Sequence, residues 1–423
     1  MRDSLLHTPD GLRDIYGSEC RRRNIMARKL TSVLELYGYQ DIQTPTFEFF
    51  DIFNHERGTV SSRDMYKFID RDGSTLVLRP DITPSIARAV AKYFRDETVP
   101  MRFSYCGSTF LNSSSLQGKL KETTQIGAEL VMDPDIEGDA ELIALAVHML
   151  LEAGLEQFQI DIGHIGLFRV LAEEAGLNEE EEENLRQLIE SKNYFAVETF
   201  LDELAPDHKI SPLFSRLPVL FGNVDVLEKA REMTDNPRAL SILDYLRRLY
   251  GLVVQYGFEK YVTIDLGMLT DYDYYTGIIF RGYTYGTGDA IVKGGRYDNL
   301  IGQFGKSAAS VGFAIVLDEL MLALSRQDIT VPTGSGAVMV LYPRNLLPQA
   351  IKIANLCRKA GTPVSMIRED GNTGVKHYLD YCRKYDIESI VHILDQTAVE
   401  EIRAADGSTV RKPFPADQEG ERP

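Results

Sequence analysis

Two long strand-like runs, residues 101–110 and 121–132, dominate the first third of the sequence. The polar loop 112–118 joins them, so they are predicted to pair as antiparallel strands. Further strands are predicted at residues 65–70, 75–79, 157–162, 262–266, 278–283 and 290–293. The turn between the first two of these contains Gly73, which is typical of a hairpin. The sequence therefore predicts an α+β domain whose core is an antiparallel sheet.

Helical spacing of apolar residues predicts a helix over residues 21–37 that ends at Gly38. Further helices are predicted at residues 80–93, 138–153 and 311–324. From residue 175 to 257 the helical spacing continues with few strand signals, and the acidic run 179–183 is typical of a helix start that the helix dipole favours. We therefore predict a helical insertion at about residues 175–257 within a core domain of residues 1–329.

A linker is predicted at residues 330–336, because this stretch contains two glycines and a proline. Beyond it strand and helix signals alternate, which predicts a small α/β domain over residues 334–423. The polar tail from about Pro413 is predicted to be disordered. A chain of 423 residues, 44% of them hydrophobic, is long enough to form two such domains.

Composition and charge argue against a membrane protein, a secreted protein and a nucleic-acid-binding protein. No apolar run is long enough for a membrane span and the N-terminal residues 1–7 do not resemble a secretory signal, so we expect a cytoplasmic protein. The net charge of −17 opposes binding to nucleic acid. Residues 336–423 carry twelve basic and twelve acidic side chains, without the basic excess of an RNA-binding surface.

Cysteine and histidine residues show no metal-ligand spacing. The four cysteines are scattered without a Cys-x-x-Cys motif, so we expect neither a disulfide framework nor a zinc site, but buried thiols: Cys20, Cys106, Cys357 and Cys382. The seven histidines likewise lack paired spacing. We therefore expect no metal and no cofactor.

Five short segments carry a resemblance to a known family. They are Thr-Pro-Asp-Gly-Leu-Arg-Asp at 8–14, Gly-Tyr-Gln-Asp-Ile-Gln-Thr-Pro at 38–45, Met-Tyr at 65–66 with Leu-Arg-Pro-Asp-Ile-Thr at 78–83, Asp-Tyr-Tyr-Thr-Gly at 273–277 with Gly-Gly-Arg-Tyr-Asp at 294–298, and Val-Gly-Phe-Ala-Ile at 311–315. In this order they resemble histidyl-tRNA synthetase. The resemblance implies a class II aminoacyl-tRNA synthetase-like core, a homodimer formed through the motif 1-like segment 38–45, and a C-terminal domain where the synthetase keeps its anticodon-binding module.

Three arginines of that family are missing at the positions that match its ATP-binding motifs. Leu111 stands where motif 2 has an arginine, Glu319 where motif 3 has one, and Thr270 where a third precedes the Asp-Tyr-Tyr motif. Amino-acid activation needs such cations, because negative charge develops on the α-phosphate. Losing each contact costs about 3 kcal/mol of transition-state stabilisation. We therefore predict that the chain is not an aminoacylating enzyme.

The amino-acid side of the family's active site is better preserved. Gln125 and Glu129 lie four residues apart on a predicted strand and so face the same way. By resemblance, the candidate histidine-binding residues are Asp81, Thr83, Gln125, Glu129, Tyr274 and Tyr275. The alternative is that the fold keeps them as hydrogen-bonded core residues. Because Thr270 replaces an arginine, a bound histidine would also need another donor for its carboxylate.

One branch of this family has the same combination of features: the regulatory subunits of ATP phosphoribosyltransferase. Resemblance to that branch implies a non-catalytic subunit that activates a short-form catalytic subunit in a hetero-octamer, at the first step of histidine biosynthesis, with histidine as feedback inhibitor. The alternatives are a true histidyl-tRNA synthetase and a synthetase-like binding protein with another partner. The sequence leaves open the stoichiometry, the surface that contacts the catalytic subunit, the role of the C-terminal domain and whether histidine binds this pocket.

Overall fold

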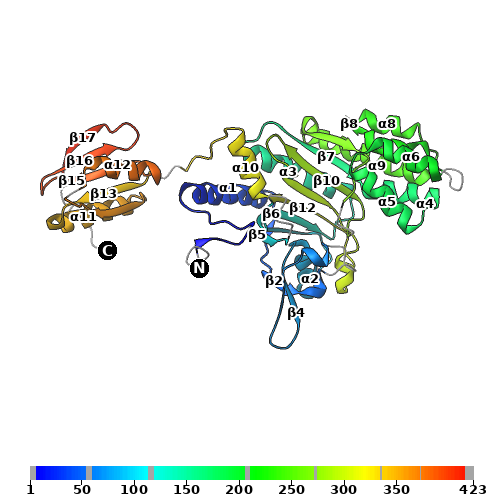
Figure 1. Ribbon diagram of the computed structural model, residues 1–423, viewed down its shortest axis with the longest axis horizontal. Coiled ribbons are helices and arrows are strands. Elements are labelled where there is room, and N and C mark those ends of the chain that lie inside the picture. Colours follow the sequence, from blue (N-terminus) through cyan, green and yellow to red (C-terminus); the bar gives the residue numbers. More distant parts are fainter. Residues whose placement is uncertain are drawn as a thin grey trace. The chain divides into compact units, whose positions relative to one another are not determined.

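A computed structural model describes residues 6–53, 60–112, 119–204, 210–270, 274–333, 336–371 and 373–414. The chain divides into two compact units, each described separately below (Figure 1). The larger unit comprises Met1–Asp14 and Met26–Thr330, and the smaller comprises Ile15–Ile25 and Val331–Pro423. The first helix, α1 (Gly17–Leu36), ends before Gly38, whose φ of +80° is a left-handed conformation that glycine adopts without strain.

The larger unit is built on one sheet that has nine strands within the described residues, in the order β1-β5-β6-β12-β11-β10-β7-β9-β8. Its strands are β1 (Gln40–Asp41), β5 (Met101–Phe110), β6 (Glu122–Val131), β7 (Phe158–His164), β8 (Phe221–Gly222), β9 (Val262–Asp265), β10 (Ile278–Thr284), β11 (Val292–Arg296) and β12 (Ser310–Val316). Most neighbours are antiparallel, while β1–β5 and β7–β9 are parallel. The prediction of an antiparallel core sheet is therefore confirmed except at these two pairs.

The two predicted hairpins are present. β5 and β6 pair antiparallel from Met101↔Val131 to Phe110↔Glu122. Upstream, β2 (Phe47–Phe49), β3 (Lys67–Ile69) and β4 (Thr75–Leu78) form a separate three-stranded sheet in the order β2-β4-β3. Gly73 lies in the β3–β4 turn with φ +88°.

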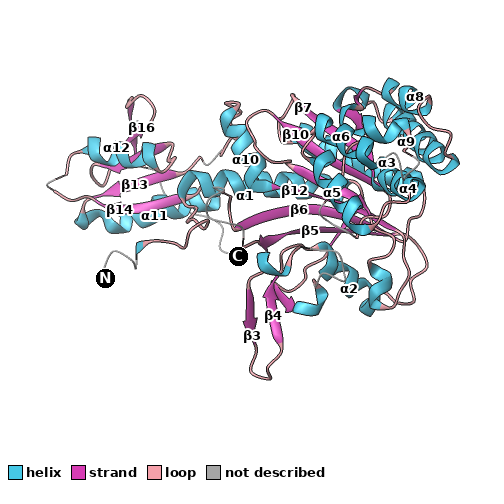
Figure 2. Cartoon of the chain, turned by 45° about the vertical axis from the view of Figure 1, so that its right-hand side comes forward, coloured by secondary structure: helices cyan, strands magenta, loops and turns pink. Residues whose placement is uncertain are grey.

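Helices pack against the large sheet (Figure 2). α3 (Ile136–Glu152) and α10 (Leu317–Arg326) contact β6 and β12, and α2 (Thr83–Tyr93) packs against Phe103 and Tyr105 of β5. α4 (Ile165–Ala175) directly follows β7. The prediction that α2 starts at Pro80 was wrong by three residues, because Pro84 occupies the first turn of the helix. α3 is the most deeply buried of these helices, with Leu142, Ile143 and Leu145 fully shielded from solvent.

A group of helices fills the chain between α4 and β9. These are α5 (Glu179–Glu190), α6 (Tyr194–Leu204), α7 (Pro212–Arg216), α8 (Asp225–Arg231) and α9 (Pro237–Gln255). The acidic run starts α5 as predicted, and Asn178 and Glu181 form a reciprocal capping box there. α9 packs against α3 and α4, so it connects this group to the sheet domain.

The prediction of a helix over residues 311–324 was wrong in its first half. Residues Ser310–Val316 form β12, and α10 starts at Leu317. β12 lies between β6 and β11 and its residues are mostly buried. A strand buried on both faces has no alternation of apolar and polar residues, so its sequence is hard to distinguish from a buried helix.

The smaller unit contains a five-stranded sheet in the order β14-β13-β15-β16-β17. Its elements are β13 (Val338–Tyr342), α11 (Leu347–Lys359), β14 (Val364–Arg368), α12 (Val375–Lys384), β15 (Ser389–Ile393), β16 (Ala398–Arg403) and β17 (Thr409–Pro413). The predicted alternation of strands and helices is confirmed up to β15, whereas β16 and β17 were not predicted. β17 ends at Pro413, and most of the tail predicted to be disordered, residues 415–423, lies outside the described residues.

Short 3-10 helices occur at Phe50–Ile52, Ser62–Asp64, Leu217–Val219, Glu259–Tyr261, Ile301–Phe304 and Arg344–Leu346. Among the described residues, no helix is both long and apolar enough to cross a lipid bilayer. None of the four cysteines, all of which lie within the described residues, forms a disulfide bond, and only Cys382 is fully buried. The prediction of a buried thiol was wrong for Cys106, which is exposed because it alternates along β5 with Tyr105 and points to the opposite face of the sheet.

Candidate functional site

The strand register leaves a row of small residues at the centre of the large sheet. Gly127 on β6 lies opposite Tyr105 on β5 and opposite Ala314 on β12, and Ala314 lies opposite Lys293 on β11. Side chains of directly opposed residues point to the same face of a sheet. Tyr105 lies over Gly127, where a Cβ atom would be 2.4 Å from its hydroxyl oxygen, and Ala314 separates this position from Lys293.

The next row on the same face is also floored by glycine. Glu129 lies opposite Gly312, which in turn lies opposite Gly295. A Cβ atom on Gly312 would lie 1.7 Å from Glu129 Oε2, and one on Gly295 would lie 2.7 Å from Tyr275 Cε1. Glycine is needed at both positions, because any side chain would occupy the space that Glu129 and Tyr275 fill.

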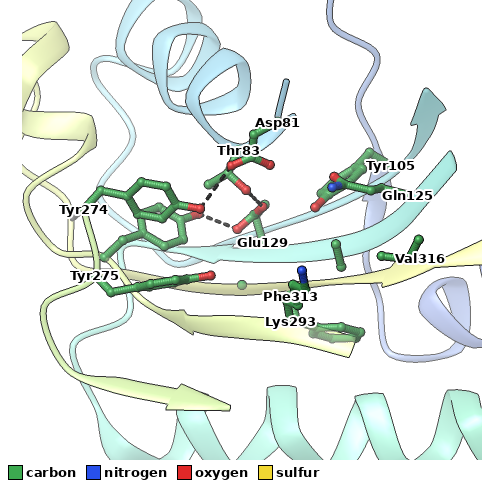
Figure 3. Close-up of a pocket in the computed structure, with 13 residues that line it drawn as sticks. Asp81, Thr83, Tyr105, Gln125, Glu129, Tyr274, Tyr275, Lys293, Phe313 and Val316 are labelled. Atoms are coloured by element: carbon green, nitrogen blue, oxygen red, sulfur yellow. Dashed lines mark hydrogen bonds between the residues drawn. The ribbon is translucent and has the colours of Figure 1, made fainter. Parts of the chain in front are cut away.

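These rows form the floor of a pocket with about 420 Å³ of empty space, part of it open to solvent (Figure 3). All six predicted histidine-binding residues line it: Asp81, Thr83, Gln125, Glu129, Tyr274 and Tyr275. The other lining residues are Tyr105, Lys293, Tyr297, Gly312, Phe313, Ala314 and Val316. Asp81 and Thr83 come from the start of α2, whereas most of the others come from the sheet. The fold thus brings residues from distant segments into one polar cavity.

Glu129 lies at the centre of the pocket and is 1% exposed. Thr83 Oγ1 donates a hydrogen bond of 2.7 Å to its Oε1, and the Tyr297 hydroxyl donates one of 2.5 Å to its Oε2. Burial raises the pKa of this carboxyl to about 8, although both hydrogen bonds act in the opposite direction. A ligand that brings a cation or a strong donor would favour the ionised form.

Asp81 is a second buried carboxyl in the same pocket. The Tyr274 hydroxyl donates to Oδ2 at 3.1 Å, and the backbone N–H of Ile82 donates to Oδ1 at 2.7 Å. Burial raises the pKa of Asp81, and the hydrogen bonds and the charge of Lys293 lower it in part. Two carboxyls whose charge is costly to bury suit a ligand with two cationic or donor groups.

Gln125 contributes a buried acceptor that the protein does not satisfy. Its Oε1 atom is shielded from solvent and accepts no hydrogen bond from the described residues. A buried amide oxygen without a donor costs about 1–3 kcal/mol, so such atoms in native proteins call for an explanation. Because Gln125 lines the pocket, an N–H group of a bound ligand would satisfy it.

A buried ion pair holds the pocket from behind. Arg296 Nη2 lies 2.7 Å from Asp139 Oδ1, and Arg296 Nη1 also donates to the carbonyl of Asp133 at 2.8 Å. The hydroxyl of Tyr245, on α9, donates to Asp139 as well. The cluster therefore fixes β11, and with it Tyr297, against α3 and the helical group. Within the described residues, no cluster of histidine, cysteine or acidic side chains is arranged to hold a metal ion.

Comparison with known proteins identifies the family to which the chain belongs. Residues 11–320 match the histidyl-tRNA synthetase family. The chain is 36% identical to the ATP phosphoribosyltransferase regulatory subunit of Acetivibrio thermocellus, with 95% of each chain covered. It is 38% identical to that of Clostridium kluyveri, with 88% of this chain and 96% of the relative covered. The chain belongs to the family of ATP phosphoribosyltransferase regulatory subunits.

Solved structures agree with this assignment. A crystal structure from Bacillus halodurans, described as an ATP phosphoribosyltransferase regulatory subunit/histidyl-tRNA synthetase, matches with a TM-score of 0.79 at 28% identity and covers 92% of this chain and 98% of that one. The histidyl-tRNA synthetase of Nostoc matches with a TM-score of 0.78 at 21% identity, with 96% of each chain covered, and shows the shared fold. The class II synthetase-like fold predicted from the sequence is thus confirmed.

The three positions predicted to have lost an arginine relative to the synthetases do not line the pocket. Leu111 is half-buried just after β5, and Thr270 is buried, with its carbonyl accepting a hydrogen bond of 3.4 Å from Arg186. Glu319 is half-buried in the first turn of α10, and burial, Asp289 and Asp318 raise its pKa. The three side chains at the positions predicted to have lost an arginine are thus apolar, polar but uncharged, and acidic.

Several pocket residues were not predicted from the sequence. Tyr297 belongs to the Gly-Gly-Arg-Tyr-Asp segment that carried the resemblance, so its motif could have identified it. Lys293 directly precedes that segment, while Tyr105 lies on β5. Their place in the pocket depends on the register of four neighbouring strands, which the sequence alone does not give.

Proposed function

We propose that this regulatory subunit activates a short-form ATP phosphoribosyltransferase catalytic subunit, and that L-histidine, the end product of the pathway, binds in the pocket around Glu129 as the feedback inhibitor. One observation carries the proposal. All six side chains that the family resemblance assigns to histidine binding line one buried pocket, while none of the three positions matched to activating arginines holds a cation. The chain would retain recognition of the amino acid without the chemistry of its activation.

The chemistry of the pocket suits histidine. Histidine offers an ammonium group and an imidazole N–H, and the pocket offers the carboxyls of Asp81 and Glu129 together with the unsatisfied oxygen of Gln125. The ring of Tyr274 lies tilted against that of Tyr275 and edge-on to that of Tyr297, so the three rings would provide an aromatic wall for the imidazole. Binding would bring a cation to two buried carboxyls and a donor to the unsatisfied oxygen of Gln125, which favours a specific ligand.

Feedback inhibition requires only that histidine prefer one of two states of the assembly. The proposed assembly is a cytoplasmic hetero-octamer with the catalytic subunit, in which two copies of this chain pair through the motif 1-like segment 38–45. The neighbouring three-stranded sheet supports this pairing, because it exposes a group of large apolar side chains: Phe47, Phe49, Phe68 and Ile69. We also propose domain limits of 1–329 and 334–423, with the helical insertion at about 175–257 and no tRNA-binding role for the C-terminal domain.

The test is formation of phosphoribosyl-ATP from ATP and phosphoribosyl pyrophosphate by the organism's short catalytic subunit. The rate is measured with and without this chain, across a histidine titration. Strong activation that histidine reverses is the expected result. An unchanged rate together with separate elution of the two proteins would overturn the proposal.

A substitution at Glu129 distinguishes the effect of the pocket on inhibition from its effect on assembly with the catalytic subunit. Glu129→Ala is expected to raise the histidine concentration needed for inhibition by about tenfold or more, since it removes a buried charged partner of the ligand. Co-elution with the catalytic subunit is expected to persist. Glu203→Ala, on the exposed face of α6, is the matched control and should leave inhibition unchanged. Equal inhibition of the Glu129 variant and the control would remove this pocket from the regulatory mechanism.

A further inference from the structure

The pocket raises a question of charge balance that the family resemblance does not answer. Free histidine carries a carboxylate, and Asp81 and Glu129 place two acidic groups in the cavity that would hold it. The residue that matches the family's arginine is Thr270. A carboxylate buried beside two other carboxyls needs a cation, because unpaired burial of charge is costly.

Two arginines lie near residue 270, but both are turned to the backbone. Arg186 donates to the carbonyl of Thr270 at 3.4 Å, and Arg281 donates to the carbonyl of Leu269 at 2.8 Å. Neither is among the residues that line the pocket. They support the segment before the Asp-Tyr-Tyr motif and do not replace the lost arginine in the cavity.

Lys293 is the single cationic side chain among the described residues that line the pocket. It stands on β11, on the same sheet face as Tyr105, and the small residues Gly127 and Ala314 lie between the two. Figure 3 shows its amino group directed into the cavity. Because the Tyr105 side chain covers Gly127 and only the small side chain of Ala314 lies between it and Lys293, the ammonium can reach a ligand that lies over Ala314.

The charge of Lys293 acts on three acidic residues. It partly offsets the rise in the pKa of Asp81 that burial causes. It also adds to the lowering of the pKa of Asp289 by Lys119, and it partly offsets the rise in the pKa of Glu319 that burial causes. An ammonium on a flexible four-carbon stem is a point charge that can move between such partners, which a planar guanidinium does less readily.

We propose that Lys293 binds the α-carboxylate of the amino acid held in this pocket, in place of the family arginine that Thr270 replaces. The ligand would lie across the sheet with its ammonium toward Asp81 and its carboxylate toward Lys293. This assignment rests on the proposed effector function and adds to it a specificity: the site selects amino acids with a free carboxylate over the corresponding amines or alcohols.

Calorimetric titration of the full chain with two ligands tests the assignment. L-Histidine carries the carboxylate, and L-histidinol replaces it with an alcohol while keeping the ammonium and the imidazole. Lys293→Met keeps most of the side-chain volume and is expected to weaken histidine binding by about 10- to 100-fold, and histidinol binding by less than about threefold. Lys293→Arg restores the charge and is expected to bind histidine within about tenfold of the unchanged chain.

Lys229→Met is the matched control, because this exposed lysine on α8 has the same charge and lies outside the pocket. It should leave the affinity for both ligands unchanged. Equal weakening of histidine and histidinol by Lys293→Met, or unchanged histidine binding, would overturn the role of Lys293 while leaving the effector site intact. Failure of the unchanged chain to bind histidine at all would overturn the effector site and the assignment together.

Discussion

The two halves of this synthetase-like site differ in how their charges are held. The amino-acid half, around Asp81, Thr83 and Glu129, is buried and joined by hydrogen bonds from different elements. In the phosphate half Lys119 pairs with Asp289 at 2.9 Å, with both side chains about half exposed, and Glu319 stands nearby. Under the proposed function, one half would bind a small polar ligand, and the other would lack the cations that stabilise a phosphate in a synthetase. Feedback regulation would need only the first half.

The largest expected effect concerns catalysis in the phosphate half. We expect amino-acid-dependent exchange of pyrophosphate into ATP to be lower than that of an active histidyl-tRNA synthetase by a factor of about 10⁶. Three missing contacts at about 3 kcal/mol each add about 9 kcal/mol to the barrier. The exchange assay is run on both proteins at equal concentration.

Restoring one cation should not recover activity. Leu111→Arg alone is expected to leave exchange at background, because two contacts would still be missing. Exchange of pyrophosphate by the unchanged chain at a rate within about a thousandfold of that of the enzyme would contradict the proposed difference between the two halves. That result would mean that other groups stabilise the phosphate.

The two halves should also differ in how much an ion pair contributes to the free energy of unfolding. Arg296→Met leaves Asp139 buried without its cation, and we expect a loss of about 3–5 kcal/mol in the free energy of unfolding. The side chains of Arg296 and Asp139 are 8% and 0% exposed. Urea denaturation of the full chain measures the change.

Lys119→Met in the phosphate half is the matched comparison. Its ion pair with Asp289 is 52% and 44% exposed, so its removal should cost no more than about 1 kcal/mol. Similar losses for the two variants would show that the support of the amino-acid half is no stronger than a surface ion pair.

Sequence and structure agree best where the signal is local. Gln125 and Glu129 were expected on one face of a strand, and β6 places both in the pocket, because alternation along a strand holds in any tertiary context. The β3–β4 turn at Gly73 was predicted for the same reason, since its geometry depends on the turn residue.

The features of the fold and of the pocket that the sequence did not predict depend on contacts between distant segments. β12 was mistaken for the start of a helix because it is buried on both faces of the sheet. Lys293 was missed because its approach to the pocket requires β11, β12 and β6 to align in one register. Neither the strand order nor that alignment is encoded in local periodicity.

The pH dependence of stability probes the centre of the amino-acid half. An unperturbed carboxyl like that of Glu129 titrates near 4.5, whereas in the fold its pKa is about 8. Between these values the folded protein holds a proton that the unfolded chain has released. The contribution of Glu129 to stability is therefore highest below the lower pKa and falls as the pH rises, by up to about 1.4 kcal/mol per pH unit.

Glu129→Gln removes this titration while keeping the shape of the side chain. Its unfolding free energy should fall less between about pH 5 and pH 8 than that of the unchanged chain, with the difference growing as the pH rises. Glu203→Gln, at an exposed position, should follow the unchanged chain. Parallel curves for all three proteins would show that Glu129 is ionised in the fold at neutral pH.

The smallest expected effect is on stability, and it distinguishes polar residues that bind a ligand from polar residues that support the core. Gln125 carries a buried oxygen without a donor in the described residues, so Gln125→Met should change the unfolding free energy of the ligand-free chain by less than about 0.5 kcal/mol, or stabilise it. Histidine affinity should fall by about tenfold, because a ligand N–H would lose its acceptor. A residue kept for the fold would behave in the opposite way, with stability lost and affinity unchanged. Denaturation and calorimetry on this one variant therefore separate the two explanations for why these polar residues are present.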